Sequence, residues 1–235
     1  QREHVKDYLF EKAATDWQRQ GIWEVTNRFS CDPRWSHMNG RSKGLAAFWN
    51  KNEFEGDFTI EFYAGMRMRQ EDMRVGVGWY YPRVGDINLT ISGDGTNVFS
   101  GYSIVHAAWD SRWSETHTRI YRGKEIVAET DKEFVPSVRK GLPRTRPIPV
   151  DWDPGGRVIH GAWYYIKVRR TGNRLDWFFD NVPVLSYEDP NPLTGKRLAL
   201  WTQDNSIVIA RAKIAYTQPP QPAIMRIDRG TQPIT

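Results

Sequence analysis

Gly56-Asp-Phe-Thr-Ile-Glu-Phe-Tyr-Ala-Gly-Met-Arg-Met68 is the stretch of sequence that decides the fold. Its apolar side chains recur at every second position, which is the period of an extended strand. One face collects Phe58, Ile60, Phe62, Ala64, Met66 and Met68, and the other collects Thr59, Glu61, Tyr63, Gly65 and Arg67. The pattern predicts a strand with one face in a hydrophobic core and an acid, a phenol and a base on the other face.

Further strand-like segments follow on both sides of this stretch. They are residues 21–26, 45–50, 75–80, 86–92, 102–109, 116–121, 126–130, 163–169, 174–179, 182–187, 197–202 and 206–216. Short strands at near-regular spacing with almost no helical pattern are typical of antiparallel β-sandwiches and jelly rolls. Only the polar N-terminal region, around residues 5–14, is expected to be partly helical. Alternation in residues 86–92 places Ile87, Leu89 and Ile91 inward and Asn88 and Thr90 outward.

The predicted organisation is one all-β jelly-roll domain over residues 1–216, followed by an extended, proline-rich tail over residues 217–235. The irregular segment at roughly residues 136–161 is rich in proline and glycine. Because strands resume after it in the same style, this segment is expected to be a functional loop and not a linker between domains.

Charge and cysteine content restrict the partners of the protein. The net charge of +5 arises from 33 basic and 28 acidic residues spread along the chain, so we expect no nucleic-acid partner. The basic run at 139–146 is read first as a solvated loop, with attraction to an anionic ligand as the alternative. Cys31 is the only cysteine, which excludes an intramolecular disulfide and argues against a cysteine zinc site.

The location of the protein is inferred from the absence of hydrophobic targeting segments. No apolar run approaches membrane-spanning length, so no membrane span is expected. The chain begins at Gln1 without a signal sequence, which fits either a cytosolic protein or a mature exported one. We expect a secreted or periplasmic protein whose signal peptide has been removed.

Aromatic residues with a polar edge are abundant, at 11 Trp and 10 Tyr. Such side chains suit a surface that holds an amphipathic ligand, and sugar rings, with apolar faces and hydroxyl rims, fit that description. The alternative is that several of the tryptophans belong to the core of the sandwich.

A resemblance to a known fold family rests mainly on residues 163–189. Trp163-Tyr-Tyr-Ile-Lys-Val-Arg169 and Leu175-Asp-Trp-Phe-Phe-Asp-Asn-Val-Pro-Val184 resemble the closing half of concanavalin A-like lectin/glucanase jelly rolls. Residues 21–25, 56–62, 195–201 and 207–214 continue the likeness, which covers roughly residues 16–216. More narrowly, the chain resembles the 3-keto-disaccharide hydrolase domain family and related proteins of polysaccharide-degrading bacteria. The resemblance implies two curved antiparallel sheets with a carbohydrate-binding groove on the concave face.

One departure from related enzymes concerns Glu61. Family 16 glycoside hydrolases of this superfamily carry paired acids at alternate positions of one strand. Here Glu61 is followed at those positions by Tyr63 and Gly65. A two-carboxylate mechanism would therefore need its second acid from another strand.

The candidate catalytic residues are Glu61, Asp86, His106 and His117. Glu61 and Asp86 lie on strands that could be neighbours, where two carboxylates would give an acid/base pair or a metal-binding corner. The histidines could act as general base or metal ligand. The alternatives are a solvated or salt-bridged role for each acid and a structural role for each histidine.

The candidate substrate-binding residues are Trp49, Lys51, Tyr63, Trp79, Asn88, Trp109, Trp113, Arg119 and Trp201. Trp79, Trp109 and Trp113 lie next to loops and suit stacking on sugar rings, whereas Arg119 and Lys51 could hold a carboxylate or sulfate of an acidic sugar. No cofactor is clearly required. Calcium is conceivable because related jelly rolls bind it, but the oxygen-rich segments 94–97, 151–153 and 204–205 lack the spacing of a calcium loop and are read as turns.

These observations predict a carbohydrate-active protein that binds an oligo- or polysaccharide, neutral or anionic, and acts as a glycosidase or related glycan-cleaving enzyme. The alternative is a non-catalytic carbohydrate-binding module or lectin on the same fold. A third interpretation is a structural β-sandwich whose aromatic residues all belong to the core. The fold alone does not decide among the three.

Overall fold

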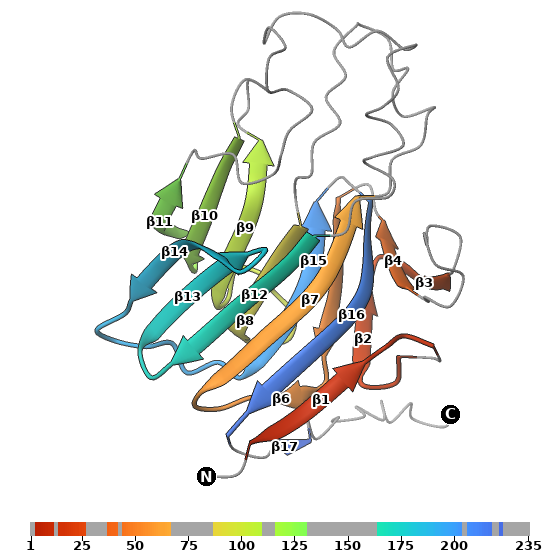
Figure 1. The fold of residues 1–235 in the computed structure, drawn as a ribbon, viewed down its shortest axis with the longest axis horizontal. Helices are drawn as coiled ribbons and strands as arrows, with labels where there is room; N and C mark the ends of the chain where they lie inside the picture. Colours follow the sequence, from red (N-terminus) through yellow and green to blue (C-terminus); the bar gives the residue numbers. More distant parts are fainter. Residues whose placement is uncertain are drawn as a thin grey trace, which may run out of the picture.

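The computed structural model of the protein describes residues 3–11, 14–26, 37–41, 44–66, 87–109, 116–130, 164–203, 206–217 and 221–222. Within these ranges the chain forms strands and turns, and none of them contains a helix that could cross a membrane. The strands form two layers of antiparallel sheet that face each other, shown in Figure 1. The predicted all-β, jelly-roll sandwich is confirmed.

The first layer is a sheet of eight strands in the order β14-β13-β12-β7-β16-β4-β3, with β1 also paired to β16. Its strands are β1 (His4–Tyr8), β3 (Ile22–Thr26), β4 (His37–Arg41), β7 (Phe58–Met66), β12 (Tyr164–Thr171), β13 (Arg174–Phe179), β14 (Val182–Glu188) and β16 (Ser206–Tyr216). β7 lies between β12 and β16, at the centre of the sheet.

The second layer is a sheet of seven strands in the order β11-β10-β9-β8-β15-β5-β2. Its strands are β2 (Trp17–Gln20), β5 (Leu45–Asn50), β8 (Ile87–Gly93), β9 (Tyr102–Trp109), β10 (Thr116–Arg122), β11 (Glu125–Thr130) and β15 (Arg197–Gln203). β6 (Asn52–Glu53) pairs with β17 (Gln221–Pro222), so part of the predicted tail is held against the sandwich. The prediction of a single domain with a tail stays a prediction.

The main hydrophobic core fills the space between the two sheets. Phe58, Ile60, Phe62 and Ala64 of β7 are at most 4% exposed and belong to this core, as the alternation predicts. Ile87, Leu89 and Ile91 of β8 enter it from the opposite layer. The alternate residues of β7, which include Glu61, therefore face outward from the eight-stranded sheet.

The outer face of the seven-stranded sheet carries a second apolar layer. Trp49 of β5 and Trp201 of β15 pack there with Val98 of the 94–101 loop. Trp201 Nε1 donates to Thr90 Oγ1 at 2.9 Å, and Thr90 Oγ1 donates to the Val98 carbonyl at 2.6 Å. Asn88 and Thr90 point away from the main core as predicted, yet both are fully buried, so that face of β8 is not a wet surface.

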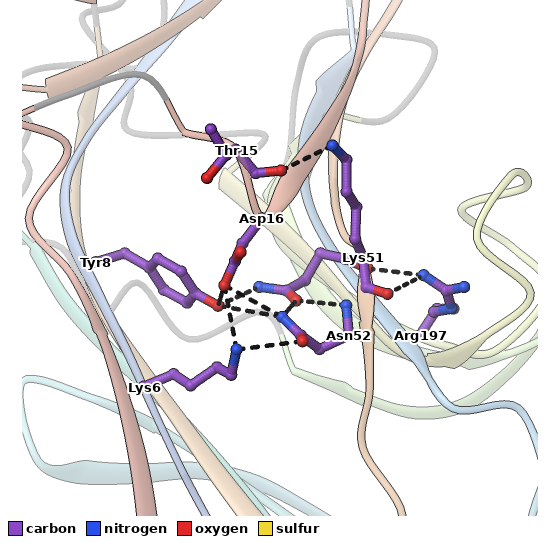
Figure 2. A network of polar contacts seen from close by, with 8 residues as sticks. Lys6, Tyr8, Thr15, Asp16, Lys51, Asn52 and Arg197 are labelled. Carbon is purple, nitrogen blue, oxygen red and sulfur yellow. Dashed lines mark hydrogen bonds and ion pairs between the residues drawn. The ribbon is translucent and has the colours of Figure 1, made fainter. Parts of the chain in front are cut away.

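The N-terminal region is a strand, so the prediction of a helix around residues 5–14 is wrong where the structure describes it. β1 pairs with β16, with Val5 opposite Ala215 and Asp7 opposite Lys213. Figure 2 shows Lys6 and Tyr8 of β1 in a polar network with Asp16 and Asn52. Pairing with a distant strand overrides the local pattern here.

Candidate functional site

An open depression on the outer face of the eight-stranded sheet is the candidate site. Its volume is about 400 Å³ and its lining residues are Glu61, Tyr63, Tyr165, Asp180, Asn181, Arg211 and Lys213. They come from three neighbouring strands, β7, β12 and β16, and from the turn between β13 and β14. The strand register brings them together, because Tyr165 lies opposite Tyr63 and Lys213 lies opposite Glu61.

Glu61 is engaged from two sides in this depression. The Tyr165 hydroxyl donates a hydrogen bond to Glu61 Oε2, and Lys213 Nζ lies 3.4 Å from Glu61 Oε1. Burial, together with the Glu61 carboxylate as acceptor, raises the pKa of the Tyr165 phenol well above its usual range. Tyr165 therefore remains a protonated donor at neutral pH and is not a general base.

Arg211 is held by an acid from the neighbouring strand β1. Its Nε donates to Asp7 Oδ1 at 2.8 Å, and Nη2 donates to Asp7 Oδ2. The hydrogen bond from Arg211 lowers the pKa of the Asp7 carboxyl, against a smaller opposing effect of burial. This two-bond geometry fixes the plane of the guanidinium group and leaves Nη1 without a partner among the described residues.

The turn between β13 and β14 supplies two further polar side chains. Asp180 and Asn181 have φ angles of 46° and 63°, the left-handed conformation that a tight hairpin requires and that Asp and Asn tolerate. Asp180 Oδ1 accepts the backbone N–H of Tyr165 at 3.1 Å. Asn181 Oδ1 accepts Lys167 Nζ at 3.2 Å. The turn is thus fixed against β12 at the edge of the depression.

Two tyrosine rings give the depression an apolar component. The rings of Tyr63 and Tyr165 lie 5.2 Å apart at 45°, and Tyr63 is 37% exposed. A partly exposed aromatic surface next to hydrogen-bonding groups of both kinds can bind a ligand with apolar and hydroxyl surfaces.

Glu61 and Tyr63 are the predicted site residues that line the depression. The strands expected to carry Glu61 and Asp86 could be neighbours by sequence, but β7 and β8 belong to different sheets and Glu61 faces away from the other layer. Asp86 itself lies outside the described residues.

His106 lies in the main core and does not line the depression. It is 2% exposed, its ring stacks on Phe179 at 5.0 Å and it meets Trp177 edge-on at 5.4 Å. Burial lowers its pKa to about 4, and neither ring nitrogen has a hydrogen-bond partner among the described residues. A role as general base or metal ligand does not fit this position, since a substrate cannot reach it.

Three of the predicted substrate-binding residues are buried on the outer face of the seven-stranded sheet. Trp49 and Trp201 are each 2% exposed and Asn88 is fully buried, with Asn88 Oδ1 accepting the backbone N–H of His106 at 3.2 Å. All three lie outside the main core, and for Asn88 alternation predicted this. They are nevertheless unavailable as a sugar platform, because the 94–101 loop packs on the same face.

Lys51 and Arg119 lie apart from the depression and have partners of their own. Lys51 Nζ donates to the Thr15 carbonyl at 2.7 Å, as Figure 2 shows. Arg119 forms an ion pair with Glu129 at 2.9 Å in the seven-stranded sheet. Neither therefore lines the same site as Glu61. Trp79 and Trp113 lie outside the described residues, and only the backbones of Trp109, in β9, and His117, in β10, are described.

The calcium hypothesis can be examined at one of its three segments, residues 94–97. Asp94 Oδ1 accepts the backbone N–H groups of Thr96 at 2.7 Å and Asn97 at 2.8 Å, which is the pattern of a turn. Across the described ranges, no three His, Cys, Asp or Glu residues cluster in a way that could hold a metal ion. Residues 151–153 and 204–205 lie outside those ranges.

The lining residues that sequence reasoning missed are Tyr165, Asp180, Asn181, Arg211 and Lys213. Alternation in residues 211–216, after a register shift between Ile209 and Arg211, places Arg211 and Lys213 on the face opposite the core, so that signal was present. The Asp180-Asn181 pair is a hairpin signal between two predicted strands. No local pattern shows that these residues meet Glu61, because this depends on which strands pair and in which register.

Comparison with solved structures finds β-sandwich domains with a similar fold. No protein-family model matches the chain, and no curated protein matches it. The exoplasmic/lumenal domain of VIP36 in a Ca²⁺/Man2-bound form has a TM-score of 0.56 at 12% identity, covering 92% of this chain and 88% of that one.

Two other carbohydrate-associated domains have similar folds. The carbohydrate recognition domain of Emp47p has a TM-score of 0.55 at 12% identity, covering 89% of this chain and 93% of that one. Carbohydrate-binding module CBM66 from Bacillus subtilis has a TM-score of 0.51 at 19% identity, covering 85% and 95%. At these identities the similarity shows the fold alone, a two-sheet antiparallel β-sandwich.

Proposed function

We propose that the protein is a saccharide-binding domain that holds a sugar in the depression between Tyr63 and Lys213. The observation that carries this proposal is the composition of one open site. A partly exposed tyrosine ring lies beside carboxylate acceptors and cationic donors that neighbouring strands hold in place. Sugars present apolar C–H faces and hydroxyl rims to such surfaces. The similarity to the folds of lectins and of a carbohydrate-binding module supports the same proposal.

Glycoside cleavage is the second candidate, and the resemblance to the 3-keto-disaccharide hydrolase family belongs with it. It is favoured by the presence of two carboxylates, Glu61 and Asp180, in one depression. Tyr165 separates them, since Glu61 accepts its hydroxyl and Asp180 accepts its backbone N–H. Glu61 is an acceptor for Tyr165 and an ion-pair partner of Lys213, whereas a glycosidase needs one carboxyl group that donates a proton. Binding without cleavage is therefore the better-supported function.

A secreted or periplasmic location is proposed together with this function. Its support is indirect: the similar folds include an exoplasmic/lumenal domain and a bacterial carbohydrate-binding module.

The first prediction tests saccharide binding itself. The protein should retain a subset of glycans on a broad array, and Tyr63→Ala should weaken that binding about tenfold, the equivalent of ~1.4 kcal/mol, because the exposed ring is lost. Calorimetry on the best glycan measures the change. Ile126→Ala, at a 44% exposed residue on β11 of the other sheet, is the control and should bind normally.

If Tyr63→Ala binds as well as wild type, or no glycan is retained, the proposal fails. Release of shorter sugars from the bound glycan would instead support cleavage.

A further inference from the structure

The two cations of the depression are each paired with an acid, which bears on the charge of its ligand. Lys213 is paired with Glu61, and Arg211 is paired with Asp7 by two hydrogen bonds. The lining contains two acids, Glu61 and Asp180, and two bases, Arg211 and Lys213. A carboxylate or sulfate group on the ligand would thus find cations that already have acid partners, and it would be repelled by Glu61 and Asp180.

The remaining hydrogen-bonding capacity of the depression suits hydroxyl groups. Lys213 has three N–H donors, and Arg211 retains the Nη1 group that Asp7 does not use. Glu61 has unused lone pairs on both carboxylate oxygens, and Asp180 keeps Oδ2 beyond the bond that Oδ1 accepts from Tyr165. Each sugar hydroxyl both donates and accepts, so adjacent hydroxyls can bridge neighbouring acceptors and donors without leaving a charge unpaired.

On the neighbouring strand face the three bases Lys167, Arg169 and Arg174 outnumber the acid Asp176, but each base has a partner. Asp176 of β13 accepts Arg169 at 2.9 Å and Arg174 at 2.8 Å. Lys167 lies 4.7 Å above the ring of Phe178 and also contacts Asn181. Each basic side chain beside the depression therefore already has an acid, an aromatic face or an amide as a partner.

We infer that the depression binds an uncharged sugar unit through adjacent hydroxyls, and that Glu61 excludes acidic sugars by occupying Lys213. This inference rests on the saccharide-binding function proposed above and specifies its ligand. A site of about 400 Å³ is at the small end for ligand pockets, which span about 300–1,000 Å³, and so fits one or two sugar rings. The anionic ligand considered from the sequence is the opposing hypothesis.

The test compares wild type and Glu61→Gln on an array of immobilised neutral glycans and their uronate and sulfated counterparts at physiological ionic strength. Wild type should prefer the neutral member of each pair about tenfold or more, which corresponds to ~1.4 kcal/mol. Glu61→Gln should lose about tenfold on the neutral glycan and reduce or reverse the preference, because Lys213 becomes available to an anion. Glu188→Gln makes the same change on edge strand β14, where Glu188 contacts Asn173, and should behave as wild type.

Two further results separate this inference from the proposed function. If wild type prefers the acidic glycans and Tyr63→Ala abolishes that binding, saccharide binding stands and the inference is overturned. If no glycan binds, both fail.

Thermal unfolding checks that Glu61→Gln folds. Lys213→Gln provides a second variant, which should weaken neutral binding while still rejecting uronates, because Glu61 remains. Unchanged selectivity in Glu61→Gln would remove Glu61 from this role.

Discussion

At the scale of single residues, His106 shows how burial changes the chemistry of a side chain. The sequence offers it as a base, but its ring lies between the sheets against Phe179 and Trp177. Because an apolar environment disfavours the charged form, the pKa of His106 falls to about 4 from its ordinary value of 6.5. The folded protein thus binds this proton less readily than the unfolded chain does.

The second prediction follows from that difference. The free energy of unfolding should be greatest above pH 6.5, the pKa of His106 in the unfolded chain, and should fall as the pH drops toward 4. At ~1.36 kcal/mol for each pH unit, the loss is at most about 3 kcal/mol. His106→Leu, a similar volume without a titrating group, should flatten the stability between pH 6.5 and about 4.5. Urea unfolding at several pH values measures this. An unchanged slope in the variant would show that another group is responsible.

Acid groups with lowered pKa values change stability in the same direction as His106 but at lower pH, so the two effects can be told apart. Asp16, Asp94, Asp176 and Asp189 have pKa values lowered from 3.8 by their hydrogen bonds, against the opposing effect of burial. Acid groups whose pKa is lower in the folded protein stabilise the fold at pH values above their unfolded pKa. This contribution is lost only as the pH falls below that unfolded pKa. Among the described groups with a shifted pKa, His106 is therefore the one that titrates between pH 6.5 and about 4.5.

At the scale of elements, the end of β8 depends on a close approach of two chain segments. The segment before β15 passes so near the backbone of β8 that a Cβ on Gly195 would lie 2.6 Å from the Ser92 carbonyl carbon and 2.8 Å from the Gly93 oxygen. Both neighbours are backbone atoms and cannot turn aside. Glycine is thus required at position 195 by space and not by its φ angle.

The third prediction is that Gly195→Ala destabilises the fold by about 3 kcal/mol or more, because the segment before β15 must move away from β8. Gly172→Ala, in the turn between β12 and β13, is the control. Its φ is +57° and an added Cβ meets nothing within 4 Å, so only the backbone strain of about 1 kcal/mol is expected. Chemical denaturation compares the two. Equal losses would mean that the segment before β15 can move away from β8 at little cost.

At the scale of the whole molecule, a polar network ties the N-terminal strand of one sheet to the other sheet. Tyr8 of β1 donates to Asp16 at 2.9 Å and accepts from Asn50, at the end of β5, at 3.1 Å. Lys6 joins Asp16 at 3.1 Å and Asn52 at 3.2 Å. Asn50 is fully buried, so its amide depends on these partners.

The fourth prediction tests this link between the layers. Tyr8→Phe should cost about 1–2 kcal/mol of unfolding free energy, because it leaves the amide of Asn50 without an acceptor. Combined with Asp16→Asn, the loss should be non-additive by about 0.5 kcal/mol or more, as expected for residues in one network. The exposed Arg119–Glu129 pair is the comparison, with a coupling of ~0.5 kcal/mol or less. Additive losses at Tyr8 and Asp16 would show that the contacts are independent.

The sequence by itself determined the class of fold and the two faces of its central strand. Alternation in β7 and β8 is a local property of the extended chain, and burial of Phe58, Ile60, Leu89 and Ile91 in the core agrees with it. Glu61 and Tyr63 were found as site residues for the same reason, since a strand residue between two core residues must face the other way.

Only the tertiary structure decided which outward faces are exposed and which residues meet. Trp49 and Trp201 point out of the main core but are covered by the 94–101 loop, which alternation cannot show. Glu61 meets Tyr165 and Lys213 from distant parts of the chain, because β12 and β16 flank β7 in a particular register. Register is chosen by packing over the whole sheet, and a shift of one residue would turn every side chain to the other face. The local pattern thus supplies the faces of each strand, and long-range pairing assembles the site.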